Sequence, residues 1–260
     1  MCVLLLSFGQ HPRYRIVAGA NRDEFYDRPT SPAAFWGDEP EVLAGRDLRQ
    51  GGTWLGVTRR GRFAALTNFR DPQSNRPGRS SRGHLVSGFL LGDEQPDAYL
   101  VKVAEHAHDY NGFSVMVSHR DALCYYSNRE NEVRSLPPGV YALSNHLLDT
   151  PWPKVTRGKR AFAELLSEAD DLDPEALLAL LSDRTAANDA ELPGTGIDLE
   201  GERLLSSLFV SGGVYGTRSS TVLLIGRRGE VTFVERTFGR DADGFTTVAH
   251  TFRMSPDDCG

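Results

Sequence analysis

Short apolar runs separated by turn residues occupy both ends of the chain. Residues 2–8 form a nearly continuous apolar run, and after the turn at 9–13 a second run covers 14–21. Both runs have the length and composition of buried strands, so we expect an N-terminal hairpin. Further strands are predicted at 54–60, 62–69, 113–119, 122–128, 139–145, 217–226, 229–238 and 245–254.

Two groups of segments with apolar residues at helical spacing lie between these strands. We expect helices at 83–91, 96–108, 157–169 and 173–184. Pro96 suits a first helical turn, and Asp173 is a candidate N-cap followed by Pro174. The segment 70–83 is predicted to be a solvated basic loop, and 186–203 an irregular connection.

The order of these elements indicates the fold class. Strands bracket two groups of helices, which predicts an α+β fold with mostly antiparallel sheet covered by helices. No repeat and no long linker divides the chain, so residues 1–260 are expected to form a single domain.

Composition narrows the possible partners and the compartment. The formal net charge of −6 disfavours nucleic acid as a partner. Three cysteines at wide spacing do not suggest a disulfide framework, and no zinc-type spacing occurs. The first apolar run is too short to span a membrane and lacks a signal peptide's basic start, so we expect a reducing, cytoplasmic location.

The position of Cys2 suggests nucleophilic chemistry. Removal of Met1, which a small second residue permits, would leave a thiol beside a free α-amine that titrates near neutral pH. Such an amine can act as the base for its own nucleophile. The alternative is a small apolar residue at the start of a strand. If the thiol is activated, we expect Cys2 to react with thiol probes even at about pH 6, where ordinary thiols are protonated.

Polar residues at the ends of apolar strands could join Cys2 in one site. Arg22 and Asp23 end the second strand, whose end lies beside the start of the first in a hairpin. Adjacent strand residues face opposite sides, so both can reach Cys2 only if the strand ends or bulges there. Further polar strand-end residues are Asn68, Asn145 and Arg218. Acyl transfer at an amide needs a nucleophile, a base and oxyanion donors, which Cys2, its amine, Asn68 and Asn145 would supply.

The strings "ANRDEFYDRP", "GGTWLGVTRRGRFAALTNFRDP", "YALSNHLLDTPWPK" and "YGTRSSTVLLI" resemble the NRDE family, the transport and Golgi organisation protein 2 group. The resemblance runs from Cys2 to about Phe252. It implies a four-layer αββα sandwich of the N-terminal nucleophile hydrolase type, closest to the penicillin V acylase and bile-salt hydrolase branch. By order and context, the branch's functional positions fall on Cys2, Asp23, Asn68, Asn145 and Arg218. Arg22 matches least well, because the acylases separate this arginine from the aspartate.

Two functions remain open from the sequence. The first is an amidohydrolase in which Cys2 attacks a small-molecule amide, with no cofactor required. The second is a non-catalytic carrier of haem or an acyl-CoA on the same scaffold, in which Cys2 could ligate haem iron. Either function implies a small-molecule partner, and the oligomeric state is left open.

Overall fold

The computed structural model describes residues 2–240 and 244–255 and contains two antiparallel sheets. One sheet has the order β10-β1-β2-β11-β12-β13. Its strands are β10 (Gly139–Leu143), β1 (Cys2–Phe8), β2 (Tyr14–Phe25), β11 (Tyr215–Gly226), β12 (Glu230–Phe238) and β13 (Phe245–Arg253). The other sheet runs from β3 to β9 in chain order. Its strands are β3 (Thr30–Phe35), β4 (Val42–Asp47), β5 (Leu55–Thr58), β6 (Phe63–Asn68), β7 (Phe113–His119), β8 (Ala122–Ser127) and β9 (Glu132–Ser135).

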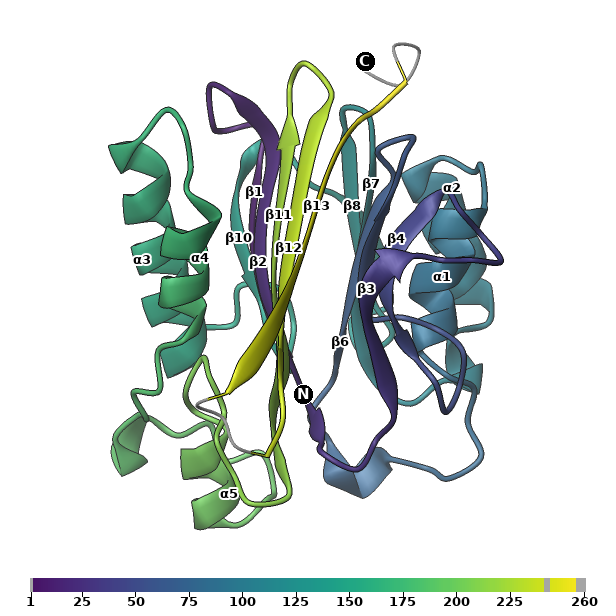
Figure 1. Ribbon diagram of the computed structural model, residues 1–260. Helices are drawn as coiled ribbons and strands as arrows, with labels where there is room; N and C mark the ends of the chain where they lie inside the picture. Colours follow the sequence, from purple (N-terminus) through teal and green to yellow (C-terminus); the bar gives the residue numbers. More distant parts are fainter. Residues whose placement is uncertain (1, 241–243, 256–260) are drawn as a thin grey trace.

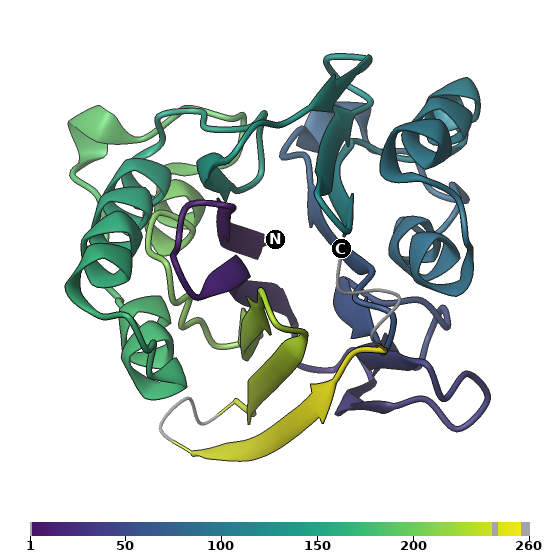
Figure 2. The ribbon, with the colours of Figure 1, turned by 90° about the horizontal axis from the view of Figure 1, so that it is seen from above.

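Helices cover the outer face of each sheet (Figure 1). The helices α1 (Gly83–Leu91) and α2 (Pro96–Glu105) pack on the β3–β9 sheet, and α3 (Pro153–Glu168) and α4 (Pro174–Leu181) pack on the other. Short helical turns are η1 (Pro72–Ser74), η2 (Ala107–Asp109), η3 (Asp189–Glu191) and α5 (Leu199–Leu204). The predicted four-layer αββα sandwich is confirmed, and the view from above shows the two sheets facing each other (Figure 2).

Apolar side chains fill three layers of core, one between each pair of neighbouring layers. The central cluster joins the two sheets and includes Leu4, Leu6, Met116 and Phe233. The second lies beneath α1 and α2, and the third beneath α3 and α4. Strands β1 and β2 are apolar on both faces because the central and the helix-side clusters cover them.

The predicted strands and helices are present, with some differences in extent. Strand β2 continues to Phe25 instead of ending at residue 21, because the backbone of its polar end stays paired with β1 and β11. The Asn21 side chain donates to the carbonyls of Leu181 and Leu208 at 2.8 and 2.9 Å. The predicted N-cap is confirmed, since Asp173 accepts a hydrogen bond from the Glu175 backbone at 2.9 Å.

Other elements were not predicted. Strands β3 and β9 are short and carry polar or exposed residues, so their apolar alternation is weak, whereas β4 is short and mostly buried on both faces and so shows no alternation. The segment 186–203, expected to be irregular, contains η3 and most of α5. The solvated-loop prediction for 70–83 is wrong at Arg70, which is 7% exposed and forms an ion pair with Glu202 at 2.9 Å.

Candidate active site

Cys2 begins β1, an interior strand between β10 and β2. In the β1–β2 register it lies directly opposite Arg22. The Ser144 hydroxyl, just beyond β10, donates to the Cys2 carbonyl at 3.0 Å and fixes the first residue of the strand from the other side. Cys2 as a residue is partly exposed, and its thiol lies in a buried environment that lines the cavity described next.

A polar cavity of about 120 Å³ lies beside Cys2. Three of the predicted site residues line it with Cys2, namely Arg22, Asp23 and Asn68. The β3–β9 side of the sandwich adds Trp54 and Arg82. The cavity therefore lies where the strand ends of the two sheets meet.

Arg22 and Asp23 both line this cavity despite being neighbours on one strand. The pairing of β2 with β11 shifts register between Thr217 and Ser219, opposite these two residues. The extra residue of this bulge is Arg218 on β11, so β2 keeps its regular alternation at Arg22 and Asp23. Arg22 and Asp23 therefore face opposite sides of their sheet, as neighbours on a strand do: Arg22 stacks on Trp54 from the other sheet, and Asp23 faces the charge of Lys154 on α3.

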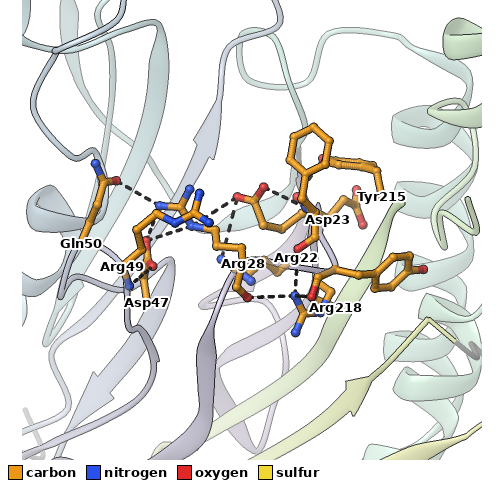
Figure 3. Close-up of polar contacts among 11 residues, drawn as sticks. Arg22, Asp23, Arg28, Asp47, Arg49, Gln50, Tyr215 and Arg218 are labelled. Carbon is orange, nitrogen blue, oxygen red and sulfur yellow. Dashed lines mark hydrogen bonds and ion pairs between the residues drawn. The ribbon is translucent and has the colours of Figure 1, made fainter. Parts of the chain in front are cut away.

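Asp23 is held rigidly at the base of the site. It is 1% exposed, and its Oδ1 accepts a hydrogen bond from the Thr217 hydroxyl at 2.7 Å. The Tyr215 hydroxyl donates to the Asp23 carbonyl at 2.8 Å (Figure 3). Contacts from β11 thus fix both the side chain and the backbone of Asp23.

The two asparagines occupy different positions. Asn68 lines the cavity at the end of β6. Asn145 is fully buried, is not among the residues that line the cavity, and donates its amide to the Asn68 carbonyl at 2.9 Å. The placement makes Asn145 a support for Asn68 and differs from the direct oxyanion contact expected from the sequence.

Arg218 points away from Cys2. It occupies the β11 bulge, and its Nη1 donates to the carbonyls of Phe25, Tyr26 and Arg28 at 2.9–3.1 Å (Figure 3). Among the described residues it does not line the Cys2 cavity. The structure therefore places Arg218 as a brace for the turn after β2, apart from the other predicted site residues.

Burial dominates the electrostatics of the site. It raises the pKa of the Cys2 thiol, although the Arg22 charge and a backbone hydrogen bond at Asp23 act in the opposite direction. This direction bears against the expected reactivity at about pH 6, because a raised pKa leaves less thiolate at acidic pH. Burial also raises the pKa of Asp23, while the charge of Lys154 opposes that rise.

Several residues of the site were not predicted from the sequence. Trp54 packs on the central core and also lines the cavity. Arg82 comes from the segment taken as a solvated loop. Lys154 is 1% exposed, and burial lowers its pKa to about 8. The only signal for Lys154 was its place in the string "YALSNHLLDTPWPK", after Asn145.

The described residues offer no evident metal centre. No group of three or more His, Cys, Asp or Glu side chains among them could hold a metal ion. His146 lies in stacking range of Phe69 and Trp152, and its ring nitrogen is 2.9 Å from the Thr150 hydroxyl. No described residue lining the Cys2 cavity is a histidine or methionine, so haem there would meet a single thiolate among charged walls, which is a poor fit.

No helix within the described part of the chain is both long and apolar enough to cross a membrane.

Solved structures with a similar fold define the structural class. A cysteine-to-alanine mutant of conjugated bile acid hydrolase from Clostridium perfringens aligns with a TM-score of 0.53 at 9% identity, covering 98% of this chain and 97% of that one. An arginine-to-leucine variant of the same hydrolase aligns with a TM-score of 0.50 at 10% identity, covering 98% of each chain. The chain therefore has the fold of the N-terminal nucleophile hydrolases.

Sequence comparison assigns the family. The family model for Transport and Golgi organisation 2 matches residues 1–240, and the chain belongs to this family. It is 41% identical to the Transport and Golgi organization protein 2 homolog of Bos taurus, over 98% of this chain and 99% of that protein. Identity to the Homo sapiens homolog is 38% over the same shares.

Proposed function

We propose that this protein is an N-terminal cysteine amidohydrolase that acts on a small-molecule amide. The observation that carries the proposal is the placement of Cys2 at the start of an interior strand, in one cavity with Arg22, Asp23 and Asn68. A strand-end thiol held at a polar cavity, with a buried carboxylate beside it, is the arrangement that acyl transfer requires.

The active form arises by removal of Met1, which lies outside the described residues. The freed α-amine of Cys2 takes the thiol proton, and Sγ attacks the amide carbon. The C–S bond forms and the carbonyl oxygen becomes an oxyanion. As the oxyanion collapses to the thioester carbonyl, the α-ammonium gives its proton to the departing nitrogen, the C–N bond breaks and the neutral amine leaves. Water then attacks the thioester, releases the acid and returns the proton to Sγ.

The side chains of the cavity have distinct roles in this scheme. Asp23, fixed by Thr217 and Tyr215, orients the α-amine. Asn68 is placed at the cavity wall to donate to the oxyanion, and Asn145 holds it there through the bond to its carbonyl. Arg22 favours the thiolate electrostatically, since its charge lowers the pKa of Cys2.

Turnover of matched variants tests the proposal. Full-length protein, shown by intact mass to begin at Cys2, is incubated with N-acyl amides, and the released amine is measured. The substitution Cys2→Ser is expected to remove turnover by a factor of about 10³ or more, as loss of a nucleophile does. Cys124→Ser is the matched control, because Cys124 is buried in β8 and contacts Ser135. Unchanged turnover in Cys2→Ser, or a mature chain that keeps Met1, would refute the proposal.

The carrier function stays an alternative prediction. A carrier of haem or an acyl-CoA needs neither Met1 removal nor a reactive Cys2. Ligand binding that is identical in Cys2→Ser and in a chain that retains Met1, together with no turnover, would favour the carrier.

A further inference from the structure

Arg22 is a buried cation without a full set of partners. It is 6% exposed, and its Nη1 has no hydrogen-bond partner among the described residues. Its Nη2 lies 3.9 Å from Oε2 of Glu24, which is too long for a hydrogen bond. Buried donors are nearly always satisfied, so an unsatisfied guanidinium in a cavity wall indicates an acceptor supplied by a ligand.

The direction of this guanidinium is fixed. Its centre lies 4.2 Å from the centroid of the Trp54 ring, a cation–π contact that restrains the guanidinium. Arg22 is also directly opposite Cys2 in the strand register, and all three residues line one cavity. Any acceptor bound by Arg22 therefore lies close to the Cys2 thiol.

The carboxylates of the cavity leave this positive charge largely unmatched. Asp47 is engaged by Arg28 at 2.5 Å (Figure 3). Asp23 is bonded to Thr217 and faces the charges of Lys154 and Arg70. Arg82 brings a second guanidinium from the opposite wall, whose Nη1 donates to the Gly112 carbonyl at 2.9 Å. Glu24 is thus the main carboxylate left to balance the positive charges of Arg22 and Arg82.

A larger cleft of about 830 Å³ adjoins the Cys2 cavity. The two share Glu24, Arg28, Asn68 and Arg82, so one ligand can extend from one into the other. The cleft has apolar walls from Phe25 on β2 and from the α5 segment, including Leu204. A ligand that fills both spaces has an apolar part in the cleft and an anionic part at Arg22.

We infer that the substrate of Cys2 is an acyl amide that carries a carboxylate close to its scissile bond, bound by Arg22, and an apolar group that occupies the adjoining cleft. Arginine suits this role because its planar fork matches both oxygens of a carboxylate. That the ligand is a substrate rests on the proposed function. Binding of a carboxylate at Arg22 does not depend on turnover.

The test measures binding in a chain that cannot react. N-octanoylglycine and its neutral analogue N-octanoylglycinamide are titrated by calorimetry into the mature full-length Cys2→Ala variant. The carboxylate is expected to bind at least about tenfold more tightly, as a charge-assisted pair in a buried site does. Equal affinity for the two ligands, or no binding of either, would overturn the inference.

Variants of two stacked arginines test whether Arg22 causes the preference for the carboxylate ligand. Arg22→Gln is expected to bind the two ligands with equal affinity. Arg59→Gln is the matched control, because Arg59 stacks on Phe35 at 3.8 Å but does not line the Cys2 cavity. A carboxylate preference that persists in Arg22→Gln would overturn the inference. If that variant does not fold, Arg22→Lys keeps the charge without the fork and should reduce the preference.

Binding and turnover separate the two proposals. A carboxylate preference without Cys2-dependent turnover would refute the hydrolase and leave the anion site standing. Cys2-dependent turnover with no preference between the matched ligands would support the hydrolase and refute the carboxylate site.

Discussion

Lys154 is the buried residue with the greatest influence on the chemistry of Asp23. It lies in the first turn of α3 with 1% of its surface exposed, and its Nζ has no hydrogen-bond partner among the described residues. The charges that act on it are those of Asp23, Arg70 and Cys2, from three other segments. Among the charges named for Asp23, that of Lys154 lowers its pKa the most. A carboxylate that must hold an amine needs to stay ionised, and Lys154 favours that state.

The substitution Lys154→Met should shift the pH dependence of Cys2. Loss of the cation raises the pKa of Asp23 further, so more Asp23 is neutral near pH 7 and the α-amine loses its ionic partner. We expect the pH profile of Cys2 alkylation in the mature chain to move by about one pH unit. Lys159→Met is the control on the same helix, since Lys159 forms a partly exposed ion pair with Asp149. If the pH profiles of Cys2 alkylation coincide for Lys154→Met and the parent chain, Lys154 has no influence on the site.

Site residues that end apolar strands are visible in the sequence, whereas those that packing brings in from helices are not. Arg22, Asp23 and Asn68 follow strands whose ends must meet in an antiparallel sandwich, so their convergence with Cys2 was predictable. Lys154 and Arg82 begin helices, and no local pattern shows which charged helix residue is turned inward. The orientation of Arg218 depends on a bulge that the strand pattern does not reveal.

At the scale of elements, the long apolar strands and amphipathic helices were predictable because burial imposes a period on the sequence. The short strands β3 and β4 were not, although they complete the wall against which Trp54 packs. Gly45 in β4 leaves room for that ring: a Cβ atom there would lie 2.4 Å from the Trp54 ring. The stack between Trp54 and Arg22 therefore depends on a glycine in a neighbouring strand.

Gly45→Ala should displace Trp54 and release Arg22. We expect the carboxylate preference in ligand binding to fall several-fold, with a loss of about 1–3 kcal/mol in unfolding free energy from overpacking. Calorimetric titration and urea unfolding measure the two effects. Gly37→Ala is the control, because a Cβ there meets no atom within 4 Å. Retention of both the preference and the stability in Gly45→Ala would show that the ring does not need this space.

At the scale of the whole molecule, Glu235 links the two sheets. It lies on β12, is 1% exposed, and accepts a hydrogen bond at 2.7 Å from the Ala33 backbone on β3. The Thr221 hydroxyl donates to its other oxygen at 3.2 Å. Burial raises the pKa of Glu235 to about 7. The carboxyl group is thus neutral in the folded state at pH values where it is ionised in the unfolded chain.

The stability of the fold should therefore depend on pH through Glu235. Its contribution is fully present below about pH 4.5 and is lost as pH rises to about 7, because only the unfolded state releases the proton in that window. The loss is about 3 kcal/mol at about 1.4 kcal/mol per pKa unit. The unfolding free energy of Glu235→Gln, measured in urea, should therefore change less over this pH range than that of the parent chain, by the same amount. Glu230→Gln, at an exposed ion pair with Arg253, is the control, and equal slopes in both variants would contradict the assignment.

The proposed covalent acyl intermediate on Cys2 can be trapped by acid quenching and located by mass spectrometry. The full-length mature chain is mixed with excess N-octanoylglycine, quenched in acid within the first turnover, digested and mapped. We expect the N-terminal peptide to begin at Cys2 and to carry one octanoyl group as a hydroxylamine-sensitive thioester, absent in Cys2→Ser. A mature chain that hydrolyses the amide while its N-terminal peptide stays unmodified, or acylation at another residue, would contradict the proposed intermediate.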